Sequence, residues 1–185
     1  MLSGCSPRKL LRLENELLKH QVTQLRGELE GCHQQTPPQD FVNDVTIEVV
    51  QEFLTRAGFP PGEQSTPTVL QVPVDGRNTQ FQMTLQLFKQ EKVLYIAAND
   101  YLQLEEASSS KSIVLLLTQI ASLNYELLLG KFQLNPNTGA IALSVEINLD
   151  DGLGFRTFNA VIYHLVQTAD LRYPELKDTA ISSGI

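Results

Sequence analysis

Apolar and polar residues alternate over residues 141–149, and this is the clearest strand pattern in the chain. Successive side chains of a strand point to opposite faces, so the odd-numbered apolar residues share one face and polar or small residues share the other. The apolar face holds Ile141, Leu143, Val145, Ile147 and Leu149. Before this run, Pro136 presets φ in a turn that Asn137 and Gly139 can close with positive φ. The stretch of residues 122–149 therefore predicts an antiparallel hairpin entered from a helix.

Helical spacing of apolar residues predicts three helices within residues 40–178. Asp40 is the expected N-cap of the first helix, which Gly58 ends. Its apolar stripe is Val42, Val45, Val49 and Phe53. The second helix is expected over about residues 112–124, and the third follows Gly154. The stripe of the third is Phe155, Phe158, Ile162, Leu165 and Val166.

Alternation predicts three further strands, at residues 68–75, 79–88 and 93–98. The element order becomes α-β-β-β-α-β-β-α. We therefore expect an α+β domain with three helices and a five-stranded antiparallel sheet that is buried on one face. No apolar run approaches the roughly 20 residues that a membrane-spanning helix needs.

Residues 8–33 carry apolar side chains at heptad spacing, which predicts a coiled-coil helix. The a and d positions form the seam Leu11, Asn15, Leu18, Val22, Leu25, Leu29 and Cys32. An Asn at an a position is typical of two parallel strands, so a parallel homodimer is expected. The alternative is an amphipathic helix folded against its own chain. Residues 34–39 contain two prolines and form a predicted linker.

The first residues include Leu2-Ser3-Gly4-Cys5, which resembles the lipobox of bacterial lipoproteins. The resemblance implies a lipid anchor on Cys5 within a tail of residues 1–7, membrane association, and a periplasm-facing place in the bacterial envelope. It requires an upstream signal peptide, because the charged and apolar parts of such a signal are not in this sequence. Taken as written, the chain would be cytoplasmic.

Charge is distributed unevenly along the chain. The sequence holds 21 acidic and 14 basic residues. Residues 1–39 contain four of the acidic and five of the basic ones, which leaves 17 against 9 in residues 40–185, a net charge of −8. An acidic body repels a phosphate backbone, so we expect no nucleic-acid partner.

The sequence contains no constellation of catalytic or metal-binding residues. His20, His33 and His164 lie far apart without metal-ligand spacing, and His164 is interpreted as structural. There is no Gly-x-Ser-x-Gly nucleophile motif. Gly152 and Gly154 lie between a strand and a helix, but no third glycine completes a dinucleotide motif. We therefore expect no cofactor, no metal and no enzymatic activity.

Three short motifs in this element order resemble the YbjN-like sensory-transduction-regulator family, whose fold is shared with type III secretion chaperones. They are Leu123-Asn124-Tyr125, Gly130-Lys131-Phe132 and Tyr173-Pro174-Glu175-Leu176. The resemblance covers residues 40–177 and implies a dimeric α+β domain that binds other proteins rather than catalysing a reaction. The N-terminal coil departs from that family.

The predicted function is therefore a non-enzymatic, chaperone-like protein-binding module on a coiled-coil stalk. Residues 40–178 would form the binding domain, residues 179–185 a flexible tail, and the protein client is unknown. The alternative is an envelope lipoprotein that acts as a structural tether or assembly factor.

Overall fold

The structure is a computed structural model that describes residues 40–104 and 110–181. The predicted lipid anchor at Cys5, the coiled-coil seam from Leu11 to Cys32 and the linker at residues 34–39 lie outside the described residues. Among the described helices, none is both long and apolar enough to cross a membrane.

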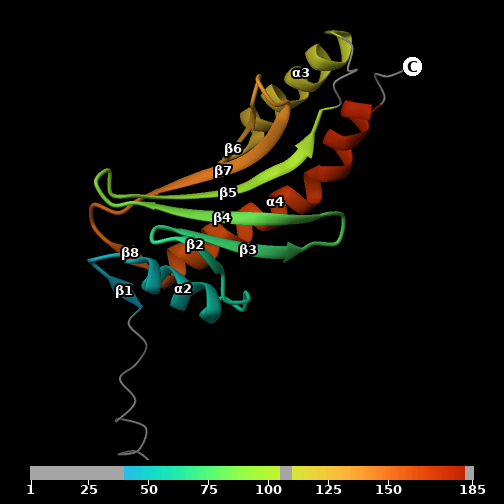
Figure 1. Ribbon diagram of the computed structural model, residues 1–185. Helices are drawn as coiled ribbons and strands as arrows, with labels where there is room; N and C mark the ends of the chain where they lie inside the picture. Colours follow the sequence, from blue (N-terminus) through green and yellow to red (C-terminus); the bar gives the residue numbers. More distant parts are fainter. Residues whose placement is uncertain (1–39, 105–109, 182–185) are drawn as a thin grey trace, which may run out of the picture. The chain divides into compact units, whose positions relative to one another are not determined.

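Six antiparallel strands form one sheet in the order β2-β3-β4-β5-β7-β6 (Figure 1). Their bounds are β2 Glu63–Thr66, β3 Val69–Asp75, β4 Gln80–Phe88, β5 Val93–Gln103, β6 Lys131–Leu134 and β7 Ala140–Asn148. A separate two-stranded ribbon pairs β1, Phe41–Val42, with β8, Leu153–Gly154. The three described helices are α2 (Ile47–Arg56), α3 (Ser110–Glu126) and α4 (Phe155–Ile181). The α+β class and the antiparallel pairing agree with the sequence prediction.

The sheet buries one face against helices, and none of the described helices covers the other face (Figure 1). All five apolar residues of the predicted β7 face are buried, as alternation requires. The helix α4 crosses the sheet and contacts β5 and β7, and its Phe158 and Ile162 are fully buried. At one end of the sheet α2 packs on β3 and α4, and at the other α3 packs on β6 and α4.

The predicted number of five strands is wrong, because the sheet has a sixth strand, β2. Its residues Glu-Gln-Ser-Thr are all exposed, so no alternation of apolar and polar residues marks it. It is an edge strand that pairs with residues 69–71 of β3. The ribbon of β1 and β8 was also not predicted, since each of its strands is only two residues long.

Asp40 is not the helix cap that the sequence predicted. The helix α2 begins at Ile47, and Thr46 is its N-cap in an extended conformation. The Asp40 carbonyl accepts a hydrogen bond from Phe155 N (2.8 Å), and its carboxylate pairs with Arg56 (2.6 Å). Asp40 therefore joins the start of the domain to the ends of α2 and β8.

Two further predictions, for the β6–β7 turn and for the end of the domain, differ in part from the structure. The β6–β7 turn closes with Gly139 at a φ of 72°, as expected. Among the described residues Lys92 is the one non-glycine with positive φ, so the left-handed conformation predicted for Asn137 is wrong. The helix α4 extends to Ile181, beyond the predicted domain end at residue 178.

Candidate functional site

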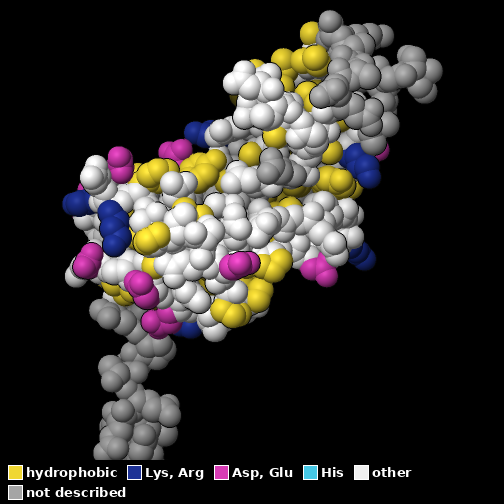
Figure 2. All heavy atoms as spheres, viewed as in Figure 1, with side chains coloured by type: hydrophobic (Ala, Val, Ile, Leu, Met, Phe, Trp, Pro, Cys, Tyr) yellow, Lys and Arg dark blue, Asp and Glu magenta, His cyan; other side chains and the backbone are white. Residues whose placement is uncertain are grey.

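The helix α3 has apolar residues on two opposite faces. Its inner stripe, Leu116, Ile120 and Leu123, is buried against the core. On the outer face Val114 is 60% exposed, Leu117 44% and Tyr125 94%. Figure 2 shows apolar side chains over α3. A surface helix normally carries charge on its outer face, so an exposed apolar face of this kind indicates a protein interface.

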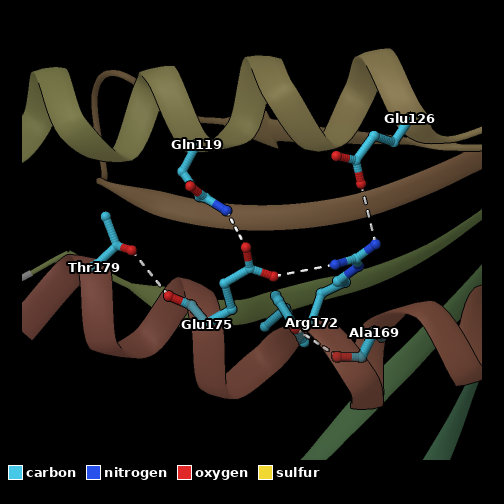
Figure 3. Close-up of polar contacts among 7 residues, drawn as sticks. Gln119, Glu126, Ala169, Arg172, Glu175 and Thr179 are labelled. Atoms are coloured by element: carbon cyan, nitrogen blue, oxygen red, sulfur yellow. Dashed lines mark hydrogen bonds and ion pairs between the residues drawn. The ribbon is translucent and has the colours of Figure 1, made fainter.

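Polar contacts hold α3 in place against α4 (Figure 3). Arg172 of α4 pairs with Glu126 of α3 at 3.3 Å and with Glu175 at 3.2 Å. Gln119 of α3 donates a hydrogen bond to the Glu175 carboxylate. These contacts fix the rotation of α3 about its own axis, so its outer apolar face keeps a defined direction.

A groove of about 880 Å³ lies where α2 ends, beside β3 and β4. Its apolar walls come from distant segments: Phe59 follows α2, and Tyr163 and Val166 lie on α4. The Phe59 and Tyr163 rings lie 5.7 Å apart, and the Tyr163 hydroxyl donates to the Ala57 carbonyl at 3.0 Å. The other lining residues are Gly58, Pro60, Pro73, Val74, Asp75, Gln80, Phe81 and Gln82.

One edge of β3 is open beside this groove. The strand β2 pairs with β3 only as far as Gln71, so no described strand pairs with the following residues on that side. Gly76 N donates to Thr79 O across the β3–β4 hairpin, which places the even-numbered residues of β3 toward β4. The carbonyls of Pro73 and Asp75 and the Asp75 N–H therefore point outward. An edge strand with such groups can pair with another chain.

Among the described residues, no cluster of three metal-ligating side chains occurs. Tyr101 is buried and donates to the Ala169 carbonyl at 2.5 Å, and burial raises the pKa of its phenol. His164 Nε2 lies 3.2 Å from the Leu129 carbonyl, so this histidine links α4 to the loop before β6.

Sequence reasoning did not find either surface. For α3, the signal was the absence of any charged residue between Lys111 and Glu126. Alternation alone could not show that β2 stops short along β3. The predicted lipidation site Cys5 and the predicted coiled-coil dimer seam lie outside the described residues, and the sequence predicted no client-binding residue.

Comparison with known protein families and with curated proteins gives no match for this chain. Solved structures do match. The ExsC–ExsE complex matches with 21% identity and a TM-score of 0.53, over 72% of this chain and 96% of that chain. YbjN from E. coli matches with 14% identity and a TM-score of 0.57, over 77% and 96%. The chain therefore has the YbjN-like, type III secretion chaperone-like fold that the sequence resemblance predicted.

Proposed function

We propose that this chain is a non-enzymatic, chaperone-like module that binds an extended segment of a client protein in the groove beside β3. The observation that carries the proposal is the open backbone edge of Pro73 and Asp75 next to apolar walls. An extended peptide that adds to a sheet edge gains affinity from backbone hydrogen bonds and specificity from side-chain pockets. The similarity to ExsC, whose structure is a complex with ExsE, supports a protein partner.

The groove suits a short apolar segment rather than a long strand. Pro73 has no N–H, so a client strand receives a hydrogen bond only from Asp75 and donates to two carbonyls. The client side chains that point inward would contact Phe59, Tyr163 and Val166. The Asp75 carboxylate at the rim favours a client with a basic residue beside its apolar anchor.

Site-specific photo-crosslinking in the native cell tests this proposal. A photoreactive phenylalanine analogue at Tyr163 should crosslink the full-length chain to a discrete client, whereas the same analogue at exposed Lys177 should not. The variant Asp75→Pro removes the outward N–H and should weaken the crosslink, while Pro73→Ala adds one and should preserve it. Equal crosslinking from residues 163 and 177, or no effect of Asp75→Pro, would contradict the groove as the client site.

Self-association is a second proposed function, and the outer face of α3 favours it. An antiparallel pairing of two α3 helices about a two-fold axis would set Val114 of each copy against Tyr125 of the other. The small residues Thr118 and Ala121 would lie at the centre, where they permit close approach. Such a contact needs no coiled coil, so it is separable from the dimer predicted for residues 8–33.

A further inference from the structure

The uncovered face of the sheet contains a trough along β7. The floor is formed by small β7 side chains, Ala140 and Ala142, with the fully buried Ser144 at its end. The neighbouring strands supply taller side chains on both sides. Adjacent strands lie about 4.8 Å apart, so β5 and β6 stand roughly 10 Å from each other across this floor. The hollow is about 480 Å³, within the usual size of a small-ligand site.

Amides and one aromatic ring form the walls of the trough. Tyr95 and Asn99 project from β5, and Gln133 and Asn135 come from β6 and its turn. Gln133 Nε2 donates to Ser144 Oγ at 2.8 Å, which holds this side chain across the face. Each amide offers a donor and an acceptor side by side, which matches the hydroxyl groups of a sugar ring.

Asn99 faces the trough because it alternates in step with Tyr95 and Ala97 on β5, and a β-bulge lies beside it. The register of β5 on β7 changes between Ala98 and Leu102, so residues 99–101 oppose Ala142 alone. Tyr101 turns inward from this bulge and is buried, while Asn99 is left on the outer face. Bulges re-aim side chains and occur frequently beside binding sites.

The charges around the trough match a neutral ligand. None of the described residues that line it carries a charge. Glu146 lies directly opposite Tyr95, at one end of the trough, and its carboxylate pairs with Lys131 of β6 at 3.6 Å. Figure 2 shows few charged side chains in the middle of this face. The acidic body repels anions, and the described lining residues offer no carboxylate to a cation.

A peptide strand is a poor fit for the same place. The strands β5, β7 and β6 are paired with one another throughout the trough, so they offer no open edge for an added strand. Among the lining residues only Leu134 is a large aliphatic residue that could seat an apolar anchor. Recognition of an extended peptide by a sheet requires one of these features.

We propose that this trough binds a neutral carbohydrate chain. Tyr95 lies against a sugar ring, since the flat apolar face of a pyranose packs on an aromatic ring. Asn99 and Gln133 bind its hydroxyls from opposite walls, and Ala140 and Ala142 leave room for the ring. This site goes beyond the proposed client-binding function and lies on β5, β6 and β7, away from the β3 groove.

Titration of the full-length chain with neutral hexasaccharides tests the proposal. The probes are chitohexaose, maltohexaose and xylohexaose, followed by calorimetry and by amide NMR. At least one should bind saturably, with shifts at Asn99 and Gln133. Tyr95→Ala and Asn99→Ala should each weaken that binding by roughly tenfold or more, because a lost hydrogen bond or ring contact has this size. Ala142→Gln fills the floor and should abolish it.

Gln71→Ala is the matched control, because this amide lies on β3, which β4 separates from the trough. It should leave hexasaccharide binding unchanged. Absence of saturable binding by all three sugars overturns the proposal, as does binding that Asn99→Ala and Ala142→Gln leave intact. The photoreactive analogue at residue 163 can also be placed in the Tyr95→Ala variant. Client crosslinking there reports on the β3 groove alone, so loss of carbohydrate binding does not imply loss of client binding.

Discussion

The side-chain amide of Asn124 makes both hydrogen bonds with Phe132 that a neighbouring strand would make. Phe132 N donates to Asn124 Oδ1 at 2.7 Å, and Asn124 Nδ2 donates to the Phe132 carbonyl at 2.9 Å. Phe132 lies on β6, the last strand of the sheet. An edge strand exposes backbone groups that invite pairing, and here a helix residue occupies them. The outward backbone groups of Phe132 on β6 are thus occupied, whereas no described strand other than β4 pairs with β3 beyond Gln71.

Asn124→Asp tests this closure. Aspartate keeps the acceptor for Phe132 N but loses the donor, and it places a carboxylate against the Phe132 carbonyl. We expect a loss of about 1–3 kcal/mol in the free energy of unfolding, because a part-buried carbonyl is left without its donor. Urea unfolding measures the change. Ser122→Ala, on the exposed side of α3, is the control, and equal midpoints for both variants would show that the amide contributes nothing.

A second prediction concerns the turn between β3 and β4, which is tied to α4 by Asp170. The Asp170 carboxylate accepts hydrogen bonds from Asn78 N at 2.7 Å and Thr79 N at 3.2 Å. The backbone carbonyl of Asp170 accepts a hydrogen bond from Asn78 Nδ2 at 3.1 Å. Pro174, four residues later in α4, has no N–H to bond that carbonyl, so Asn78 replaces the missing helical donor.

Gly76→Ala should break this connection. A Cβ at Gly76 would lie 2.3 Å from Asp170 Oδ1 and 2.7 Å from the Thr79 carbonyl, so the turn must move away from α4. We expect destabilisation of about 1–3 kcal/mol, the usual cost of overpacking. Thermal unfolding measures it against Arg77→Ala, an exposed change in the same turn. If the Gly76→Ala and Arg77→Ala variants unfold at the same temperature, the close approach of Gly76 to Asp170 has no energetic role.

The third prediction is a loss of stability at alkaline pH caused by Tyr101. Burial, followed by the nearby Tyr173 and Asp170, raises the pKa of the Tyr101 phenol above its usual value of 10.0. The unfolded chain therefore releases this proton at lower pH than the folded chain does. Stability is fully present below pH 10.0 and decreases as the pH rises above it.

Tyr101→Phe separates the contribution of the hydrogen bond to Ala169 from that of the ionisation of the phenol. At neutral pH the variant should lose about 1 kcal/mol, because the Ala169 carbonyl loses its donor. Above pH 10.0 its stability should fall less steeply than that of the wild type. Unfolding midpoints between pH 7 and 11 measure both effects. Tyr125→Phe, at a 94% exposed position, should follow the wild type, and parallel curves for all three chains would rule out Tyr101 as the cause.

Local patterns in the sequence were sufficient for most of this fold. Strict alternation predicted which residues of β7 are buried, because a one-residue slip would move every apolar side chain to the other face. The strand β2 could not be predicted, since its four polar residues are placed by pairing with β3. Asp40 resembled a helix cap, yet Thr46 has that role because Phe41 and Val42 pair with β8.

The candidate sites were less accessible from sequence for a physical reason. The groove joins Phe59 to Tyr163, which are distant in sequence and meet only when α2 and α4 pack together. In α3, apolar residues occur nearly all around the helix, so periodicity could not decide that Leu116 is buried and Leu117 exposed. The inward position of Tyr101 depends on a bulge that no sequence pattern predicted.

The last prediction separates two routes to a dimer. One is the coiled coil expected for residues 8–33, with Asn15 setting two strands, and the other is the outer face of α3. Leu117→Asp places a charge in the middle of that face, and burial of an unpaired charge is costly, so the α3 contact should be lost. Leu117 is 44% exposed, so the folded monomer should tolerate the change. Analytical ultracentrifugation measures the association state of four chains: the wild type, Leu117→Asp, a chain that starts at residue 34, and the combination.

Each single change should leave a dimer, through the coil in Leu117→Asp and through α3 in the shortened chain, and the combination should be monomeric. Lys177→Asp is a control, because it also places an aspartate at an exposed position but on α4 instead of α3, and it should leave association unchanged. A monomeric shortened chain would assign the dimer to the coil alone. A dimeric combination would mean that neither seam explains association, and the open β3 edge would then be the remaining surface to test, because strands can pair there between two copies.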